Sequence, residues 1–205
     1  AIVVLCFVGA ASSLTYSTGE PCDFTHINLE GAVRKIVEML PEYMPVGSQS
    51  FQPVFAGLEI GGANVSGLNK FRQYGPLLPF CLNGTRMLQV DLIISGGAGI
   101  SAPWRHCSGS EGSIILRASL MRLTTHFIVN VSESSRDVSL SYVGRKIPVT
   151  TEDVVFVLEG AGEVAAQVSV GLGLVFRPVI ETLWRDIFYS GFVLGLRKVL
   201  DGNYQ

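Results

Sequence analysis

The fold is decided by one stretch near the C-terminal end of the chain, residues 173–200, which reads GLVFRPVIETLWRDIFYSGFVLGLRKVL. Arg177, Glu181 and Arg185 follow one another at helical spacing and form a thin polar stripe of alternating charge. Most of the remaining positions are large and apolar: Phe176, Val179, Ile180, Leu183, Trp184, Ile187, Phe188, Phe192, Val193, Leu194 and Leu196. A surface helix is apolar along one stripe only, so a sheet is expected to bury this helix on nearly every side.

Helical periodicity extends over residues 163–200, and Pro178 is expected either to kink this helix or to restart it in a first turn. A second, amphipathic helix is predicted over residues 23–40, capped by Asp23 or Thr25 and ended by Pro41. Its apolar face consists of Ile27, Val33, Ile36, Val37 and Leu40.

Between the two helices the apolar period changes to two, which predicts strands. The expected strands are residues 54–60 with a bulge at 61–62, a continuation at 65–68, and then 86–94, 114–131, 138–143 and 154–158. The glycine-rich segment 95–99 is expected to be a hairpin connection, because the Gly-Lys-Ser/Thr of a phosphate-binding loop does not follow it. Strands without helices between them indicate an antiparallel sheet and an α+β fold.

Composition excludes several classes of protein. The 205 residues are 48% hydrophobic and 16% charged, whereas a typical soluble protein is about 25% charged. Disordered chains combine low hydrophobicity with high charge, so disorder is excluded. With 15 Lys+Arg against 17 Asp+Glu there is no basic excess for phosphates, so no nucleic-acid partner is expected.

The longest clean apolar run is residues 1–11, AIVVLCFVGAA. A membrane-spanning helix needs about 20 apolar residues, so no transmembrane segment is predicted. The run has the length of the apolar part of a secretory leader and is followed by small residues. Residues 1–11 are therefore interpreted as a residual signal-peptide segment and residues 12–205 as a single domain that is secreted and extracellular. The alternative interpretation of residues 1–11 is a buried first strand.

Secretion makes two further predictions. Asn64, Asn83 and Asn130 each begin an N-x-S/T sequon and are candidate glycosylation sites. Beyond the leader, Cys22, Cys81 and Cys107 allow three single pairings and one leftover thiol. A Cys81–Cys107 disulfide is favoured because it closes a local loop of glycine-rich sequence, which would leave Cys22 free or paired with another chain.

Signs of catalysis are weak. His26, His106 and His126 are the available neutral-pH bases, and no Ser lies in a G-x-S-x-G motif. No cysteine–histidine spacing fits a zinc site, and the acidic residues are scattered singly. No enzyme activity, cofactor or metal is therefore expected. A nucleophile within hydrogen-bond reach of one of the three histidines would revive a hydrolase hypothesis.

The apolar C-terminal helix has a physical consequence for ligand binding. A sheet rolled around it encloses an apolar space, and a fatty chain transferred there gains about 0.8 kcal/mol per methylene. The candidate ligand-binding residues are Phe176, Ile180, Leu183, Trp184, Ile187 and Phe188. The competing interpretation is that these side chains simply fill their own core.

The layout of the chain resembles the dust-mite group 7 allergen family. The similarity rests on VSGLNKFRQYGP at residues 65–76, on the C-terminal helix stretch, and on a helix–strands–helix order with a proline inside the last helix. The resemblance implies an elongated super-roll shared with juvenile-hormone-binding, takeout-type and bactericidal/permeability-increasing proteins. It also implies an arthropod source and no catalytic residue. Three cysteines beyond the leader and the low charge depart from the family pattern.

Two functions follow from these expectations. The first is a secreted, non-enzymatic carrier or binder of lipid or another apolar small molecule. The second is a secreted interaction protein, of allergen or immune-modulating salivary type, that binds a host or microbial protein or a lipopeptide through a surface groove. An exposed apolar patch over a fully packed interior would favour the second function.

Overall fold

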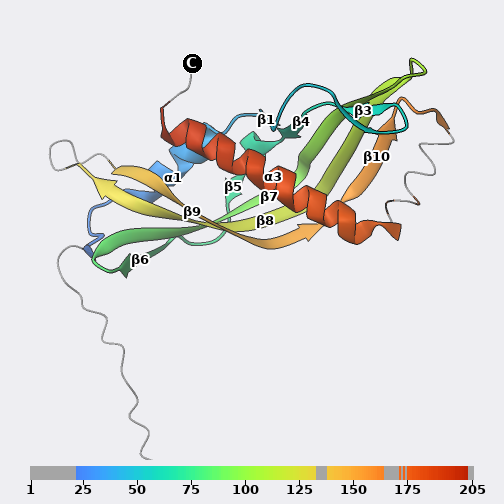
Figure 1. Ribbon diagram of the computed structural model, residues 1–205. Helices are drawn as coiled ribbons and strands as arrows, with labels where there is room; N and C mark the ends of the chain where they lie inside the picture. The colour runs from blue at the N-terminus through green and yellow to red at the C-terminus, as the bar shows by residue number, and fades with distance from the viewer. Residues whose placement is uncertain (1–21, 133–137, 164–170, 172, 174, 203–205) are drawn as a thin grey trace, which may run out of the picture.

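The computed structural model describes residues 22–132, 138–163, 171, 173 and 175–202 (Figure 1). The predicted leader at residues 1–11 lies outside this part. One long sheet carries two helices, α1 (Leu29–Glu38) and α3 (Arg177–Leu200). The fold-class prediction is confirmed, because the chain combines an antiparallel sheet, an amphipathic N-terminal helix and a long C-terminal helix.

The centre of the sheet is a long hairpin of β7 (Thr85–His106) and β8 (Glu111–Val131). Their pairing extends from Met87 opposite Ile128 to Arg105 opposite Glu111. On the free side of β8 lie, in succession, β9 (Val138–Glu152) and β10 (Val155–Glu159). On the free side of β7 lie β6 (Leu78–Leu82), β5 (Arg72–Gln73), β4 (Ala63–Ser66) and β3 (Leu58–Ile60). Two outer strands, β1 (Tyr43–Val46) and β2 (Gln52–Phe55), pair with β4 and β3.

The predicted strands 86–94, 114–131 and 138–143 were correct in position and too short in extent, and 154–158 matches β10 to within one residue. The predicted strand at 65–68 is strand only in part, because β4 ends at Ser66 and a 3-10 helix covers Leu68–Lys70. The glycine-rich segment predicted as a hairpin connection is instead a bulge inside β7, where Gly96 and Gly97 adopt φ of 76° and 82°. The register shifts there, between Ser95 and Ala98. Positive φ is accessible to glycine without steric cost, so the strand continues through a bend instead of ending.

The buried face of the hairpin changes at this bulge. Before it, Leu88, Val90, Leu92 and Ile94 of β7 are covered, and after it Ala98, Ile100 and Trp104 are covered. In β8 the buried positions change from Leu116 and Ala118 to Met121, Leu123, Thr125, Phe127 and Val129. Side chains alternate strictly along a strand, so opposite faces of the ladder are buried at the two ends. The twist that accumulates along such long strands accounts for this change.

The predicted single strand at residues 54–60 is also corrected, since β2 and β3 form a hairpin. Ala56 and Gly57 make the turn with φ of 46° and 77°, the left-handed pair that suits a two-residue hairpin. The sequence offered no Asn-Gly or Asp-Gly signal at this position.

The first helix is shorter than predicted but uses the predicted face. It begins after Asn28, whose side-chain oxygen accepts a hydrogen bond from the Gly31 N–H at 2.9 Å. The predicted caps have another role, because Asp23 Oδ1 accepts from the Thr25 N–H at 2.8 Å, before the helix. Val33 is buried, and Ile27, Ile36 and Val37 pack against the same core.

Helix α3 begins at Arg177 with Pro178 in its first turn. Of the two alternatives expected for Pro178, the structure shows the start of a helix and not a kink. Burial on nearly every side is not observed, because the sheet stays open on one side of the helix. Val179, Leu183 and Leu194 are 55%, 46% and 44% exposed. The opposite side faces the sheet, and Gly191 and Gly195 allow close approach there: a Cβ at Gly191 would lie 2.5 Å from Val65 Cγ2.

The predicted Cys81–Cys107 disulfide is wrong, because Cys22 pairs with Cys81 across a Cα–Cα distance of 5.7 Å. Cys81 pairs with Arg86 at the start of β7, whereas Cys107 follows the last residue of that strand. An extended strand of 22 residues is about 70 Å long, far beyond the reach of a disulfide. Cys107 is a free, exposed thiol.

Candidate ligand-binding sites

The structure does not bring the six candidate ligand-binding residues of α3 into one site. Ile180, Trp184 and Phe188 lie on the buried side of the helix, at 7%, 1% and 0% exposure. Phe176 and Leu183 lie on its open side at 52% and 46%, and Ile187 is half-buried. The helix therefore presents two different apolar faces, one packed and one open.

The packed face meets aromatic side chains and leaves little room. Trp184 stacks on Phe188 with ring centroids 4.8 Å apart, and Phe71 meets Phe192 edge-on at 5.1 Å. A small void of about 10 Å³ lies between α1, α3 and the sheet, bordered by Val33, Leu40, Val90 and Leu196 among others. That volume can hold about one water molecule and is too small for a fatty chain. In this region the aromatic residues fill their own core.

A cleft opens beside this core, between α3 and β9. Its volume is about 320 Å³, and Trp184, Arg185, Glu181 and Tyr189 line it from the helix side. Val149, Thr150, Thr151 and Val154 line it from the sheet side. The Nε1 atom of Trp184 is buried and lacks a hydrogen-bond partner within the described part of the chain. We call this hollow the helix cleft; among the six candidate residues, Trp184 is the one that lines it.

A second hollow lies at the far end of the β7–β8 hairpin, and we call it the tip basin. Its volume is about 420 Å³. It is lined by Phe55, Ala56 and Leu58 of the β2–β3 hairpin, Trp104, His106, Ser108 and Ser110 of the β7–β8 turn region, Ile114 of β8, and Leu158, Gly160 and Ala161 at the end of β10. Ligand pockets commonly have volumes of about 300–1,000 Å³ and mostly apolar walls, and the basin fits both criteria.

The basin exists because α3 does not extend far enough to cover it. Leu58, Trp104, Ile114 and Leu158 share one face of the sheet, since cross-strand partners lie on the same side. Helical Gly173, just before α3, lies against Phe156 of the same face, with its Cβ position 3.5 Å from the Phe156 Cβ. Leu158 lies two positions farther along β10 and is half-buried. The apolar face therefore continues past the end of its helical cover.

Polar atoms at the rim of the basin bond to one another. His106 Nε2 lies 3.0 Å from the Ala56 carbonyl and His106 Nδ1 lies 2.8 Å from Ser108 Oγ. The Cys107 N–H donates to the Gly57 carbonyl at 3.0 Å. Trp104 Nε1 in the wall donates to the Glu159 carbonyl at 3.0 Å. These contacts hold the β2–β3 hairpin against the β7–β8 turn. Because these polar atoms are already hydrogen-bonded, they do not need a polar ligand in the basin.

The Ser108–His106 contact meets the distance criterion for a hydrolase stated above. Its local geometry has a simpler explanation, because the Ser108 N–H also donates to His106 Nδ1 at 3.2 Å within the same exposed turn. The other ring nitrogen faces a backbone carbonyl instead of a carboxylate. The contact stabilises the turn.

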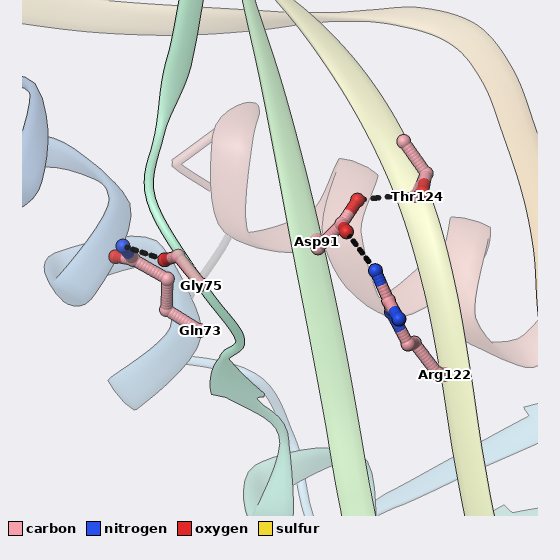
Figure 2. A network of polar contacts seen from close by, with 5 residues as sticks. All are labelled: Gln73, Gly75, Asp91, Arg122 and Thr124. Carbon is pink, nitrogen blue, oxygen red and sulfur yellow. Dashed lines mark hydrogen bonds and ion pairs between the residues drawn. The ribbon is translucent and has the colours of Figure 1, made fainter.

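A separate polar network lies on the opposite face of the sheet from Val90 and Leu92, at the other end of the hairpin (Figure 2). Asp91 accepts hydrogen bonds from Thr124 Oγ1 at 2.6 Å and from an Arg122 guanidinium nitrogen at 2.5 Å. Burial opposes ionisation of Asp91, but the hydrogen bonds from Thr124 and Arg122 and the Arg122 charge outweigh it, so its pKa is lowered. Arg122 also lies over the Tyr74 ring, 4.5 Å from its centroid. Sequence reasoning missed this network because its members are single polar residues in separate strands.

The three sequon asparagines occupy different environments. Asn83 is exposed in the tight turn between β6 and β7, and Asn130 is exposed near the end of β8 with its Nδ2 donating to Ser141 Oγ at 2.9 Å. Asn64 is half-buried in β4. Steric access for a glycan is therefore best at Asn83.

No family model and no curated protein matches this chain. Among solved structures, the crystal structure of lipopolysaccharide binding protein is similar at a TM-score of 0.43 and 14% identity. The match covers 83% of this chain and 36% of that protein, so the chain spans about a third of its length. The resemblance to mite group 7 allergens thus remains one of sequence layout. In the described ranges, no helix combines the length and apolar character needed to cross a membrane.

The basin residues were not predicted from the sequence. Leu58, Trp104, Ile114, Leu158 and Ala161 belong to separate segments, and no local motif links them. The one usable signal was that the apolar alternation of the β strands extends beyond the length that a single helix covers.

Proposed function

We propose that the protein is a non-enzymatic binder of lipid or other apolar ligands and that the tip basin holds the apolar part of the ligand. The observation that carries this proposal is a hollow of about 420 Å³ with an apolar wall and with rim polar atoms already bonded to one another. Burial of a hydrocarbon chain against such a wall stabilises the complex by about 0.8 kcal/mol per methylene, whereas a strongly polar ligand gains no such binding energy.

Binding of a fluorescent fatty acid in solution tests this proposal. We expect saturable binding to the unmodified protein and displacement by unlabelled fatty acid. Ala161→Trp fills the basin from its edge and should weaken binding at least about tenfold, because several buried methylenes are lost. Leu82→Trp, at an exposed position by the β6–β7 turn, is the matched control and should bind normally. Equal binding by the two variants would exclude the basin as the site.

The helix cleft is where Trp184, one of the ligand-binding residues predicted on α3, would contact a bound ligand. The charged lining residues of the cleft, Arg185 and Glu181, suit the polar end of an amphipathic ligand better than its tail. Replacing Arg185 with Gln should weaken a fatty acid more than the corresponding alcohol if a carboxylate binds there. Equal losses for both ligands would remove the cleft from the proposal.

Secretion is part of the same proposal. The Cys22–Cys81 disulfide supports an oxidising compartment, and exposed Asn83 supports glycosylation there. Amidase treatment of protein secreted by a eukaryotic host should increase its electrophoretic mobility. Asn83→Gln should remove the largest share of that change, and an unchanged mobility would contradict the glycan proposal.

The open side of α3 favours a second candidate function, binding of a protein or lipopeptide partner. Phe176, Val179, Leu183 and Leu194 are each at least 44% exposed along one side of this helix, above a packed core. Leu183→Asp should abolish partner binding and leave fatty-acid binding intact if this surface is the functional one. Unchanged partner binding by Leu183→Asp would remove this surface from the proposal.

A further inference from the structure

Two strongly exposed apolar side chains lie beside the tip basin. Val54 is 54% exposed and Phe55 is 69% exposed, both at the end of β2 and immediately before the Ala56–Gly57 turn. Figure 1 shows β3, the partner strand of this hairpin, at one extremity of the molecule beside the tip of the β7–β8 hairpin. Phe55 lines the basin, and both residues line a smaller hollow of about 340 Å³ next to it.

The hairpin that carries these side chains is held in place. The His106 ring bonds to the Ala56 carbonyl, the Cys107 N–H bonds to the Gly57 carbonyl, and Cys107 Sγ lies 2.5 Å from the Cβ position of Gly57. These contacts fix the backbone of the turn that directly follows Val54 and Phe55. The apolar side chains therefore stay at the surface in a fixed position, which is unfavourable in water unless something covers them.

The charged residues around the tip basin indicate which kind of lipid surface could bind there. Glu59 and Arg105 form an ion pair, and the Arg105 guanidinium lies 4.3 Å from the centroid of the Phe51 ring. Glu111 and Glu159 are exposed close to the basin. The surface thus lacks the basic excess that attraction to anionic lipids requires. Apolar side chains beside a neutralised pair of charges fit an electrically neutral lipid surface, where Arg105 can lie at the level of the headgroups.

We propose that this tip docks on a neutral lipid bilayer, with Val54 and Phe55 inserted among the acyl chains. The proposal rests on the proposed function and extends it by naming the source of the ligand. Because Phe55 belongs both to the docking surface and to the basin wall, an acyl chain can pass from the bilayer into the basin without crossing water. The docking surface and the ligand site are continuous.

Co-sedimentation with phosphatidylcholine vesicles tests the docking surface. We expect the unmodified protein to sediment with the vesicles, and Val54→Asp to bind at least about tenfold more weakly, because it places a charge where an apolar side chain should insert. Val54 does not line the basin, so this variant should keep full fatty-acid binding in solution. Leu82→Asp, an exposed leucine near the opposite end of the hairpin, is the matched control and should sediment normally.

The two proposals fail in different ways. Ala161→Trp should lose fatty-acid binding in solution but still sediment with vesicles, since Val54 and Phe55 are unchanged. Equal sedimentation of Val54→Asp and Leu82→Asp would overturn the docking proposal and leave the basin untouched. Binding only to vesicles that contain anionic lipid would also overturn it. So would a dimer of the unmodified protein that Val54→Asp converts to a monomer, because a second copy would then be the occupant.

Discussion

The two ends of the β7–β8 hairpin differ in how completely their apolar side chains are covered. At the end where α1 and the second half of α3 lie, which we call the closed end, Leu88, Val90 and Leu123 are fully buried. At the end formed by the β2–β3 hairpin, the β7–β8 turn and β10, which we call the tip end, Ile114 and Leu158 are only half-buried and Phe55 is exposed. The same alternating pattern thus gives a core at one end and an open apolar hollow at the other.

The lengths of the elements explain the difference. A helix of 24 residues is about 36 Å long, whereas a strand of 22 residues is about 70 Å long. Helix α3 cannot cover the whole hairpin, and Leu196 borders the same small void as Val90 and Phe127, which places the second half of the helix at the closed end. Stability should therefore depend on the closed end, and ligand contact on the tip end.

Truncation of an aromatic core residue should show the largest effect. Phe192 is fully buried on the second half of α3 and meets Phe71 at 5.1 Å. Phe192→Ala should lower the free energy of unfolding by about 3–5 kcal/mol in urea titrations. Leu183→Ala, on the open side of the first half, should cost less than about 1 kcal/mol. Similar losses in the two variants would mean that the open side of the helix contributes as much to stability as its packed side.

Loss of the disulfide should have the next largest effect. The bond joins the segment before α1 to β6 and closes a separation of 59 residues. The double variant Cys22→Ser, Cys81→Ser should lose about 2–4 kcal/mol of stability. Cys107→Ser at the tip end is the control, and its urea midpoint should not change because Cys107 is exposed and outside the disulfide. A large loss with Cys107→Ser would contradict the asymmetry between the ends.

Local features of this fold were predictable from the sequence, because neighbouring residues determine them. The apolar face of α1 around Val33 and the start of α3 next to Pro178 follow from periodicity and from proline chemistry. Each depends on residues within a few turns or a few positions of one another.

Features set by long-range pairing were not predictable. Strand β7 continues through Gly96 and Gly97, and this separates Cys107 from Cys81 and leaves Cys22 as the disulfide partner of Cys81. The glycine-rich sequence at this point had predicted a turn instead. The tip basin likewise depends on where α3 stops relative to Phe156 and Leu158. No local pattern encodes the relative lengths of a helix and a hairpin that it crosses.

A close backbone approach between α3 and β4 gives a prediction of intermediate size. A Cβ at Gly191 would lie 2.5 Å from Val65 Cγ2 and 2.7 Å from Val65 Cβ, inside contact distance. Gly191→Ala should therefore cost about 1–3 kcal/mol in spite of the better helix propensity of alanine. Adding Val65→Ala should recover part of this loss, which a double-mutant cycle would measure. Gly171→Ala is the control, since no atom of the described residues lies within 4 Å of its Cβ position, and it should be neutral or slightly stabilising.

The smallest effect distinguishes two ion pairs, one at each end. Asp91 at the closed end bonds to Arg122 and Thr124, and its pKa lies below the ordinary 3.8. A lowered folded-state pKa gives stability that is complete above the ordinary value and disappears as the pH falls through the folded-state pKa. Asp91→Asn should therefore cost about 1–2 kcal/mol at pH 7 and progressively less below about pH 4 in urea titrations. Glu59→Gln breaks the exposed pair with Arg105 at the tip end and should cost less than about 1 kcal/mol. A pH-independent loss in Asp91→Asn would show that packing, not charge, gives this network its stabilising effect.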